Sequence, residues 1–203
     1  MLLVLDPITH LYTVDGVVRP GVNEILQAEG IVDFSSIPAE RLTAAQNLGK
    51  AVHVACELWD KNDLDMKSVD LAIVPYLEAY IKFKRDLHVD VIVNEVSIYS
   101  KTWGFCGTLD KIVYADNILT LLDIKTSTTM NHATTLQTAA YKILYEETVG
   151  KKVIKQRWGL QLKPDATYRI EPYLGKSDET IFTSLVVVHT FKTRLFKKGE
   201  TNG

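Results

Sequence analysis

The sequence predicts an α/β domain with a mixed central β-sheet flanked by helices. Two β-type segments, residues 105–115 and 118–125, are joined at Asp116-Asn117, residue types that tolerate left-handed backbone and favour a tight turn. Segments with helical spacing of apolar residues lie before and after this pair. The length of 203 residues and the apolar content of 46% fit one globular domain with a substantial core.

The remaining elements follow in order from their patterns and turn residues. We expect strands over residues 2–5 and 11–18 (with a turn at Asp15-Gly16), a short helix ending at Gly30, helices over 39–60 and 68–88 separated by an acidic loop, a strand over 89–99, a helix over 133–149, strands over 152–163 and 167–173, and a last helix over 177–197. The expected single domain, 1–203, has an entry segment (1–35), a core (36–150), a C-terminal hairpin and helix (151–198) and a disordered tail (199–203).

The segment from Gly104 to Lys125 carries the residues with the clearest chemical meaning. In its second strand, every second residue from Leu119 to Lys125 points to one face, so an apolar strip ends in the Asp123 carboxylate and the Lys125 ammonium group. Asp110 lies across the turn and can join them. Two carboxylates held close together repel each other unless one keeps its proton or a cation lies between them.

A divalent metal would resolve this repulsion. Mg²⁺ and Mn²⁺ prefer oxygen ligands, so Asp110, Asp123 and the backbone carbonyl of Ile124 form a candidate ligand set. Lys125 would then face the substrate, where its ammonium group can orient a metal-activated water and stabilise charge on a phosphate undergoing hydrolysis. From these residues alone, a structural ion pair at a strand end is the alternative interpretation.

Two further residues are candidates for the same site. His53 shares a helix face with Glu57, so both can point at a metal or at each other, although a single histidine on a helix is more often structural. Glu95 ends an apolar face that also includes Val91 and Val93. Glu95 could bind a metal, orient a ligand, pair with Lys125 or be an ordinary exposed strand residue.

Polar residues follow the strand that ends at Lys125. Residues 126–129 could cap the next helix or donate to a phosphate. In that helix, Gln137 and Tyr141 share a face and can extend over the strand ends. Without further information, a surface glutamine and a packed tyrosine are the alternative.

Charge and cysteine content narrow the functional classes. Residues 1–100 contain 8 basic and 15 acidic residues (−7), and residues 101–203 contain 15 basic and 10 acidic residues (+5). A set of basic residues in the second half could flank a phosphate track or form a solvated surface: Lys142, Lys151, Lys152, Lys155, Arg157 and Lys163. Cys56 and Cys106 provide neither a disulfide framework nor a zinc site, and we expect both in the core.

No segment approaches the roughly 20 apolar residues of a membrane span. The apolar start of the chain is interrupted by Asp6-Pro7 before it could form a signal sequence. We therefore expect a cytoplasmic protein without a membrane partner. A glycine-rich phosphate-binding loop, the mark of a nucleotide-driven motor, is not found in the sequence.

Three motifs occur in a fixed order: G-T-L-D at 107–110, D-I-K-T-S at 123–127 and Q-x-x-x-Y at 137–141. Together they resemble the PD-(D/E)XK nuclease superfamily, in particular its RecB-like and phage exonuclease branch. The segment from Gly49 to His53 resembles the G-x-x-x-H helix of that branch, and Glu95 stands where these proteins often carry a glutamate. Leu109 replaces the proline of the family name, and Asp123 provides the second acidic position.

The resemblance implies a restriction-endonuclease-like (PD-(D/E)XK) core and assigns roles to the candidate residues. The implied roles are metal ligands for Asp110 and Asp123, completion of the metal shell for His53, Glu95 or the Ile124 carbonyl, activation of water for Lys125, and positioning of the DNA strand or the lysine for Gln137 and Tyr141. The implied activity is that of a Mg²⁺- or Mn²⁺-dependent DNA exonuclease in phage or bacterial recombination or repair. Such exonucleases often form ring-shaped homo-oligomers and act with a single-strand annealing or DNA-binding protein; a phage-encoded one works in the host cytoplasm.

Three alternatives remain from the sequence. The same ligands could serve a structure-specific DNA endonuclease, which would cut circular DNA. A non-catalytic DNA-binding subunit could keep the fold, although the intact Asp110, Asp123 and Lys125 argue against it. An enzyme acting on another phosphate ester would use similar chemistry.

Overall fold

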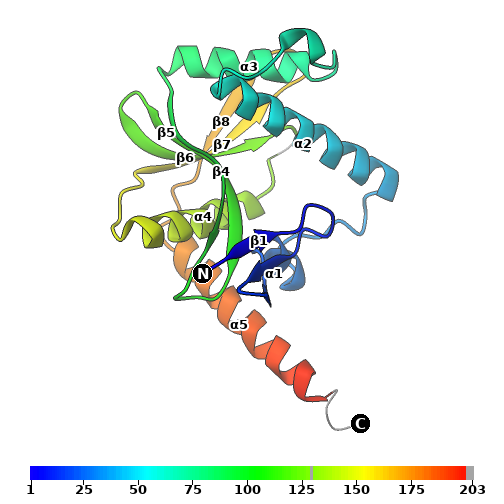
Figure 1. Ribbon diagram of the computed structural model, residues 1–203, viewed down its shortest axis with the longest axis vertical. Coiled ribbons are helices and arrows are strands. Elements are labelled where there is room, and N and C mark those ends of the chain that lie inside the picture. Colours follow the sequence, from blue (N-terminus) through cyan, green and yellow to red (C-terminus); the bar gives the residue numbers. More distant parts are fainter. Residues whose placement is uncertain (129, 200–203) are drawn as a thin grey trace.

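The computed structural model describes residues 1–128 and 130–199, with side chains for all of these except 196–199 (Figure 1). Thr129, part of the polar segment after Lys125, and residues 200–203 of the expected tail lie outside the described residues.

A five-stranded sheet forms the centre of the protein. In spatial order, its strands are β4 (Asp90–Tyr99), β5 (Cys106–Ala115), β6 (Ile118–Lys125), β7 (Gln156–Leu162) and β8 (Tyr168–Pro172). Neighbouring strands are antiparallel except β6 and β7, which are parallel because helix α4 (Ala133–Val149) connects them as a crossover. The predicted mixed α/β fold is confirmed, as is the hairpin at Asp116 and Asn117, whose φ angles are 45° and 65°.

Helices cover both faces of this sheet (Figure 1). Helices α1 (Val22–Ala28), α4 and α5 (Asp178–Gly199) pack on one face, and α2 (Ala39–Asp60) and α3 (Val74–Asp86) pack on the other. The alternation predicted for β6 is confirmed. Leu119 and Leu121 contact the hydrophobic core under α1, α4 and α5, whereas Leu122 and Ile124 contact the core under α2 and α3.

A separate antiparallel sheet forms at the N-terminus from β1 (Leu3–Leu5), β2 (Tyr12–Val14) and β3 (Val17–Arg19). The expected turn at Asp15 and Gly16 has positive φ at both residues. The chain then joins the central sheet, because the Cys106 amide donates to the Pro20 carbonyl at 2.9 Å. This contact places α1 beside β5.

Two predicted element starts are too early. Helix α3 begins at Val74 instead of residue 68, because Pro75 lacks the amide that a helix interior requires and fits only the first turn. Strand β7 begins at Gln156 instead of residue 152, because the amides of Val153 and Ile154 donate to the Glu146 carboxylate.

Two other boundaries also differ from the prediction. The acidic loop contains a short 3₁₀ helix, Met66–Ser68, whose first turn is capped by the Asp65 side chain. Helix α5 continues to Gly199, so it includes the first residue of the tail that the sequence predicted to be disordered.

Strand β4 does not alternate regularly, so the predicted common face of Val91, Val93 and Glu95 is wrong. A β-bulge separates the first two residues: Val91 pairs with Val113, and Val93 pairs with Ile112. Because Val113 and Ile112 are adjacent, they point to opposite faces, and so do their partners. Glu95 departs further from strand geometry, with a φ of 44°.

A buried charged network fixes the end of α2 on the sheet. Asp60 Oδ2 accepts hydrogen bonds from Lys111 Nζ and from the Tyr80 hydroxyl, both at 2.8 Å. Lys111 also donates to the Asn94 carboxamide. The Lys111 and Asp60 side chains are 1% and 3% exposed. Because Asp60 lies about two helical turns after His53, this network holds that part of α2 in place over the strands.

Replacing Asp60 with alanine is expected to lower the free energy of unfolding by about 3–5 kcal/mol, because Lys111 would remain buried without its partner. Urea unfolding of the variant, followed by circular dichroism, measures this change. The exposed Asp63 provides the matched control Asp63→Ala, which should change stability little. Equal stability of Asp60→Ala and the wild type would contradict the buried charge pair.

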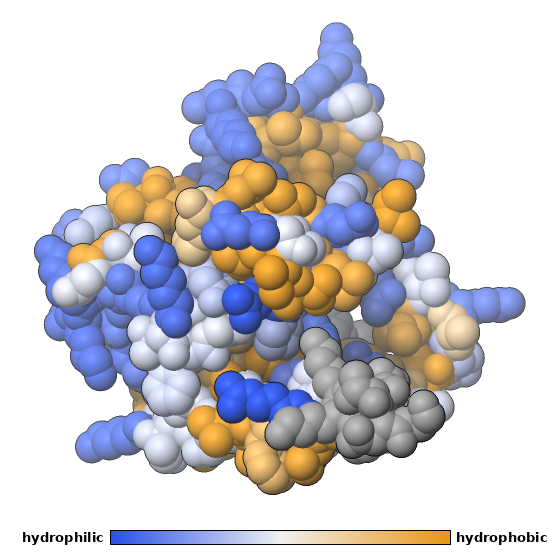
Figure 2. Space-filling view, turned by 60° about the horizontal axis from the view of Figure 1, so that its bottom comes forward, coloured by the Kyte–Doolittle hydropathy of each residue, from blue (hydrophilic) through white to orange (hydrophobic). Residues whose placement is uncertain are grey.

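Helix α5 extends beyond the rest of the protein towards the C-terminus (Figure 1). Several of its apolar side chains are exposed: Ile181, Val187, Val188, Phe191 and Leu195. Figure 2, which turns this end forward, shows patches of hydrophobic residues between hydrophilic ones. Within residues 1–128 and 130–199, helices of sufficient length are too polar to serve as membrane spans.

Candidate active site

Three acidic residues lie at neighbouring positions on three adjacent strands. The β5–β6 ladder runs to the pair Lys111 and Leu122, so the next residues along it, Asp110 and Asp123, face each other. The regular ladder ends there, and the Asp110 side chain bridges the two strands, because its Oδ2 accepts a hydrogen bond from the Ile124 amide at 2.6 Å. The third acidic residue is Glu95 of β4, the strand on the other side of β5.

The position of Glu95 follows from the register of β4 and β5. It lies between the pairs Asn94–Lys111 and Val96–Leu109, opposite Asp110. Both Val93 and Val96 contact the core under α4, although residues three apart in a regular strand point to opposite faces. The positive φ of Glu95 explains this reversal, and it directs the carboxylate away from the regular pleat.

His53 of α2 lies above these carboxylates. Its Nδ1 is 3.2 Å from Glu95 Oε1 and 3.6 Å from Asp110 Oδ1. Its Nε2 is 3.1 Å from the Ile124 carbonyl oxygen. Ligand atoms of His53, Glu95 and Asp110 all lie within 4.8 Å of one another. The helix, β4, β5 and the Ile124 carbonyl of β6 thus converge on one point.

Lys125 connects this cluster to α4. Its Nζ lies 2.6 Å from Asp123 Oδ2 and donates to Gln137 Oε1 at 3.1 Å. Gln137 Nε2 in turn donates to the Tyr141 hydroxyl at 3.0 Å and to Asn23 Oδ1 at 3.1 Å. Gln137 therefore uses both amide hydrogens and its carbonyl to hold the lysine in a fixed orientation.

Burial and neighbouring charges shift the pKa values at the site. Burial alone lowers the pKa of His53, but the Asp110 and Glu95 carboxylates outweigh it and raise the pKa to about 9. Burial raises the pKa of Asp123 to about 6, against the opposing effect of Lys125. Burial lowers the pKa of Lys125, whereas the Asp123 and Asp110 carboxylates raise it, with a net increase. An imidazolium and an ammonium group thus compensate the carboxylates in this structure.

The donor set fits a divalent metal. Carboxylate and carbonyl oxygens suit Mg²⁺ and Mn²⁺, and a histidine nitrogen is accepted more readily by Mn²⁺. Both Asp123 oxygens are buried; Oδ2 pairs with Lys125, whereas Oδ1 has no hydrogen-bond partner among the described residues. Buried carboxylate oxygens without partners are costly unless a ligand uses them. His53, Glu95 and Asp110 are near enough to one another to contribute to such a centre, and the Ile124 carbonyl contacts His53. Asp123, which pairs with Lys125, is not part of this group of three.

Several sequence candidates lie outside this cluster. Glu57 forms an ion pair with Lys61 at 2.5 Å instead of facing His53. Arg157 is buried and pairs with Asp178 at 2.5 Å, so it is not part of a basic surface. The capping expected from residues 126–129 is not observed for 126–128, because α4 begins after His132 and Ala133 donates to Asn131 Oδ1.

Lys151, Lys152 and Lys155 do not line the cluster either. Lys155 donates its backbone amide to the Leu119 carbonyl, at the start of β6, whereas Lys125 is at its end. Six residues of strand separate these positions by roughly 20 Å. Lys151 and Lys152 precede Lys155, so the predicted phosphate track does not run along this segment to the site.

Both cysteines are buried, as predicted. Burial raises the pKa of each thiol to about 12, which leaves Cys56 and Cys106 unreactive near neutral pH.

Two residues that shape the site, Asn23 and Gly107, were not predicted to do so from the sequence. Asn23 contacts Gln137 from 114 positions away, and no local pattern marks such a contact. Gly107 of the G-T-L-D motif has a packing role: a Cβ there would lie 2.9 Å from Tyr141 Cε1 and Leu144 Cδ1. The absence of a side chain at Gly107 therefore lets α4 bring Tyr141 close to β5.

Comparison with known proteins supports the fold. No protein-family model and no curated protein matches this chain. Among solved structures, the chain is similar to a protein from Eubacterium rectale assigned provisionally as an exonuclease (TM-score 0.52, 11% identity, covering 87% of this chain and 74% of that one). It is also similar to an alkaline exonuclease from Laribacter hongkongensis (TM-score 0.43, 13% identity, covering 90% and 93%).

The five-stranded mixed sheet and its helical layers share the fold of the Eubacterium rectale protein. The family resemblance predicted from the sequence is confirmed at the level of the fold.

Proposed function

We propose that this protein is a metal-dependent deoxyribonuclease that hydrolyses phosphodiester bonds in DNA, and specifically an exonuclease. The observation that carries the proposal is the convergence of His53, Glu95 and Asp110, whose ligand atoms lie within 4.8 Å of one another, next to the ion pair of Asp123 and Lys125. A structural ion pair would require one carboxylate and one cation, whereas this cluster contains three carboxylates on adjacent strands. The fold adds support, because it is that of PD-(D/E)XK nucleases.

Each residue has a distinct task in this proposal. A bound Mg²⁺ or Mn²⁺ would supply Lewis-acid stabilisation of the phosphate and lower the pKa of a coordinated water. Asp110, Asp123, the Ile124 carbonyl, Glu95 and His53 would hold the metal. Lys125 Nζ would donate to the attacking water and to the phosphate oxygens, whose negative charge increases in the transition state.

Gln137 and Tyr141 would position the reacting groups. The Gln137 carbonyl already accepts from Lys125, so it restricts the directions in which the ammonium group can donate. Tyr141 is buried, and burial together with the Asp123 and Asp110 charges raises the pKa of its hydroxyl. The tyrosine therefore stays neutral and supports Gln137, while DNA would approach on the side of α4 and α1.

The finer assignment is an exonuclease of phage or bacterial recombination or repair, acting with a single-strand annealing or DNA-binding protein and forming a homo-oligomer. Its support is the order of the sequence motifs and a fold shared with a protein assigned provisionally as an exonuclease.

Cleavage of end-labelled linear duplex, single-stranded and covalently closed circular DNA tests the proposal, with Mg²⁺, Mn²⁺ or EDTA. We expect metal-dependent loss of linear DNA, release of mononucleotides or short products from one end, and intact circles. Cutting of circles would instead indicate an endonuclease. Binding without cleavage under all metal conditions would indicate a non-catalytic DNA-binding subunit.

Replacing His53 with alanine is expected to weaken metal binding, because the site loses the ligand nearest both Glu95 and Asp110. The concentration of Mn²⁺ that gives half-maximal cleavage should rise by roughly 10-fold to 100-fold, the effect seen when a residue supporting a metal site is removed. His88→Ala is a matched control, because His88 is exposed and pairs with Asp116 at the hairpin. An unchanged Mn²⁺ titration would remove His53 from the metal shell.

A further inference from the structure

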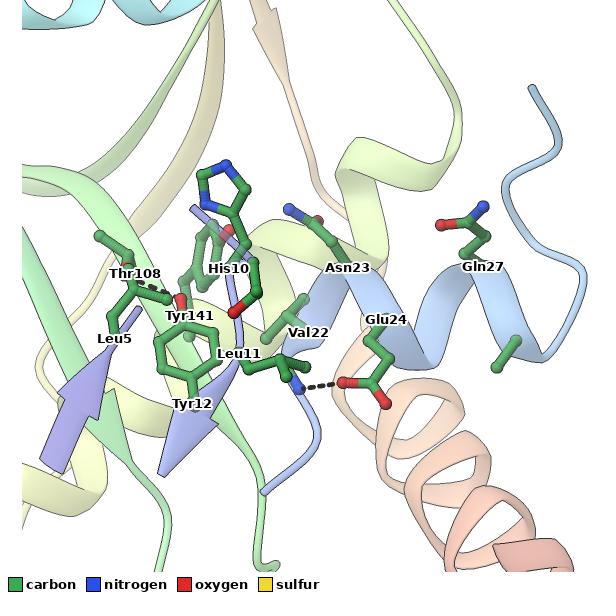
Figure 3. A pocket seen from close by; sticks show the side chains of 14 residues that line it. Leu5, His10, Leu11, Tyr12, Val22, Asn23, Glu24, Gln27, Thr108 and Tyr141 are labelled. Carbon is green, nitrogen blue, oxygen red and sulfur yellow. Dashed lines mark hydrogen bonds between the residues drawn. The ribbon is translucent and has the colours of Figure 1, made fainter. Parts of the chain in front are cut away.

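A pocket of about 610 Å³ lies between the N-terminal sheet, α1 and the central sheet (Figure 3). This volume is within the range of pockets that bind small organic groups. Tyr12 of β2, Thr108 of β5 and Tyr141 of α4 line it, so elements from distant parts of the chain form its walls. We infer that this pocket is a nucleobase-binding subsite next to the candidate active site; the inference rests on the proposed nuclease function.

The pocket is connected to Lys125 through two short hydrogen-bond paths. Asn23 and Tyr141 both line the pocket, and both accept hydrogen bonds from Gln137 Nε2. Gln137 is in turn the acceptor for Lys125 Nζ. A strand with its phosphate beside Lys125 could therefore place a neighbouring base in the pocket.

The charge of the pocket suits a base and not a phosphate. Neither lysine nor arginine is among its lining residues, and its carboxylate, Glu24, accepts a hydrogen bond from the Gly21 amide. A phosphate would find no cation there. A neutral base could occupy the pocket while the phosphate of the neighbouring nucleotide lies beside the cationic Lys125, at the end of β6.

An aromatic wall and free polar groups provide the two kinds of contact that bases require. The Tyr12 ring is held in place, because its hydroxyl bonds Thr108 Oγ1 at 2.8 Å and its edge packs against Gly21, where a Cβ would lie 3.0 Å from the ring. Stacking on such a ring is tolerant of base identity. His10 and Gln27 are exposed, and their side chains have no hydrogen-bond partner within the described part of the chain.

Figure 3 shows His10, Asn23 and Gln27 extending to the same side of the pocket. Their imidazole and carboxamide groups can donate to and accept from the edges of a base. An unstacked base is required for such contacts, because both its face and its edge must be accessible. The pocket therefore favours a single-stranded or frayed end over an intact duplex at the position next to the scissile phosphate.

Substrates that differ only in one base test this inference. Two linear DNAs are compared, one with a normal nucleotide next to the scissile phosphate and one with an abasic residue there. Wild-type kcat/KM should favour the normal substrate roughly tenfold or more, the size expected for loss of one stacked base. The ratio should fall towards one in Tyr12→Ala and in Gln27→Ala. Ile8→Ala, an exposed change in the same loop as His10, should keep the wild-type ratio.

A second measurement does not depend on catalysis. Saturation-transfer NMR with deoxyadenosine, without metal, should show contact of the base protons with the wild-type protein and loss of this contact in Gln27→Ala. The variant is expected to fold, because the Gln27 side chain is exposed. The sugar phosphate 2-deoxyribose 5-phosphate should give no signal from this pocket.

The two proposals fail in different ways. Cleavage of DNA with equal kcat/KM for normal and abasic substrates, together with no deoxyadenosine contact, would overturn the subsite and leave the nuclease assignment intact. Deoxyadenosine contact that is lost in Gln27→Ala, without cleavage of any DNA, would support the subsite and overturn the nuclease assignment. Deoxyadenosine contact that persists in Tyr12→Ala and Gln27→Ala would also overturn the subsite.

Discussion

Replacing Lys125 with alanine is expected to lower the rate of DNA cleavage by roughly 100-fold to 1,000-fold, the effect of removing one donor that stabilises transition-state charge. Lys125 is suited to this role because it is fixed between two partners, Asp123 Oδ2 at 2.6 Å and Gln137 Oε1 at 3.1 Å. A side chain fixed in this way needs little reorganisation when negative charge develops on a phosphate. The loss should appear mainly in kcat.

The variant should still fold, because the Lys125 side chain is 26% exposed and lies at a strand end. Circular dichroism and thermal unfolding check this point alongside the cleavage assay with labelled linear duplex. Lys61→Ala is the matched control, since Lys61 also pairs with a carboxylate but lies on the exposed side of α2. A folded Lys125→Ala protein that cleaves DNA at the wild-type rate would refute the site assignment.

The parts of the site that could be predicted from the sequence are those that depend on local geometry. The hairpin at Asp116-Asn117 and the alternation of β6 both follow from residue types and period-2 spacing, and together they place Asp110 opposite Asp123. His53 could be proposed because the G-x-x-x-H segment resembles a known motif and its helix has a clear apolar pattern. In the structure its ring lies within 3.6 Å of Asp110.

The parts that could not be predicted depend on irregular backbone or on long-range packing. The sequence marked Glu95 as a candidate but gave the wrong face pattern, because a bulge and a positive φ interrupt β4. Arg157 resembled a surface cation, yet it is buried against Asp178 of α5, an element that is separated from it in sequence. Asn23 joins the site because α1 packs beside β5, α4 and α5, an arrangement that depends on tertiary packing.

Two substitutions at Asp110 should separate its structural role from its chemical one. Asp110 Oδ2 accepts a hydrogen bond from the Ile124 amide at 2.6 Å, where the regular ladder of β5 and β6 ends, and Oδ1 faces His53. In Asp110→Asn, the carboxamide oxygen can still accept from Ile124, but the negative charge that a metal requires is lost. We therefore expect a thermal stability close to wild type, with cleavage reduced to background at all Mg²⁺ concentrations.

Asp110→Ala should lose cleavage to the same extent, and it should also be less stable than the wild type. The buried Ile124 amide would have no acceptor, which costs about 1–3 kcal/mol. Urea unfolding and Mn²⁺-dependent cleavage of both variants are compared with Asp90→Asn, an exposed change on the same sheet. Cleavage retained in Asp110→Asn would show that Asp110 positions Ile124 without binding the metal. Equal stability of the asparagine and alanine variants would show that the Ile124 hydrogen bond does not hold the two strands together.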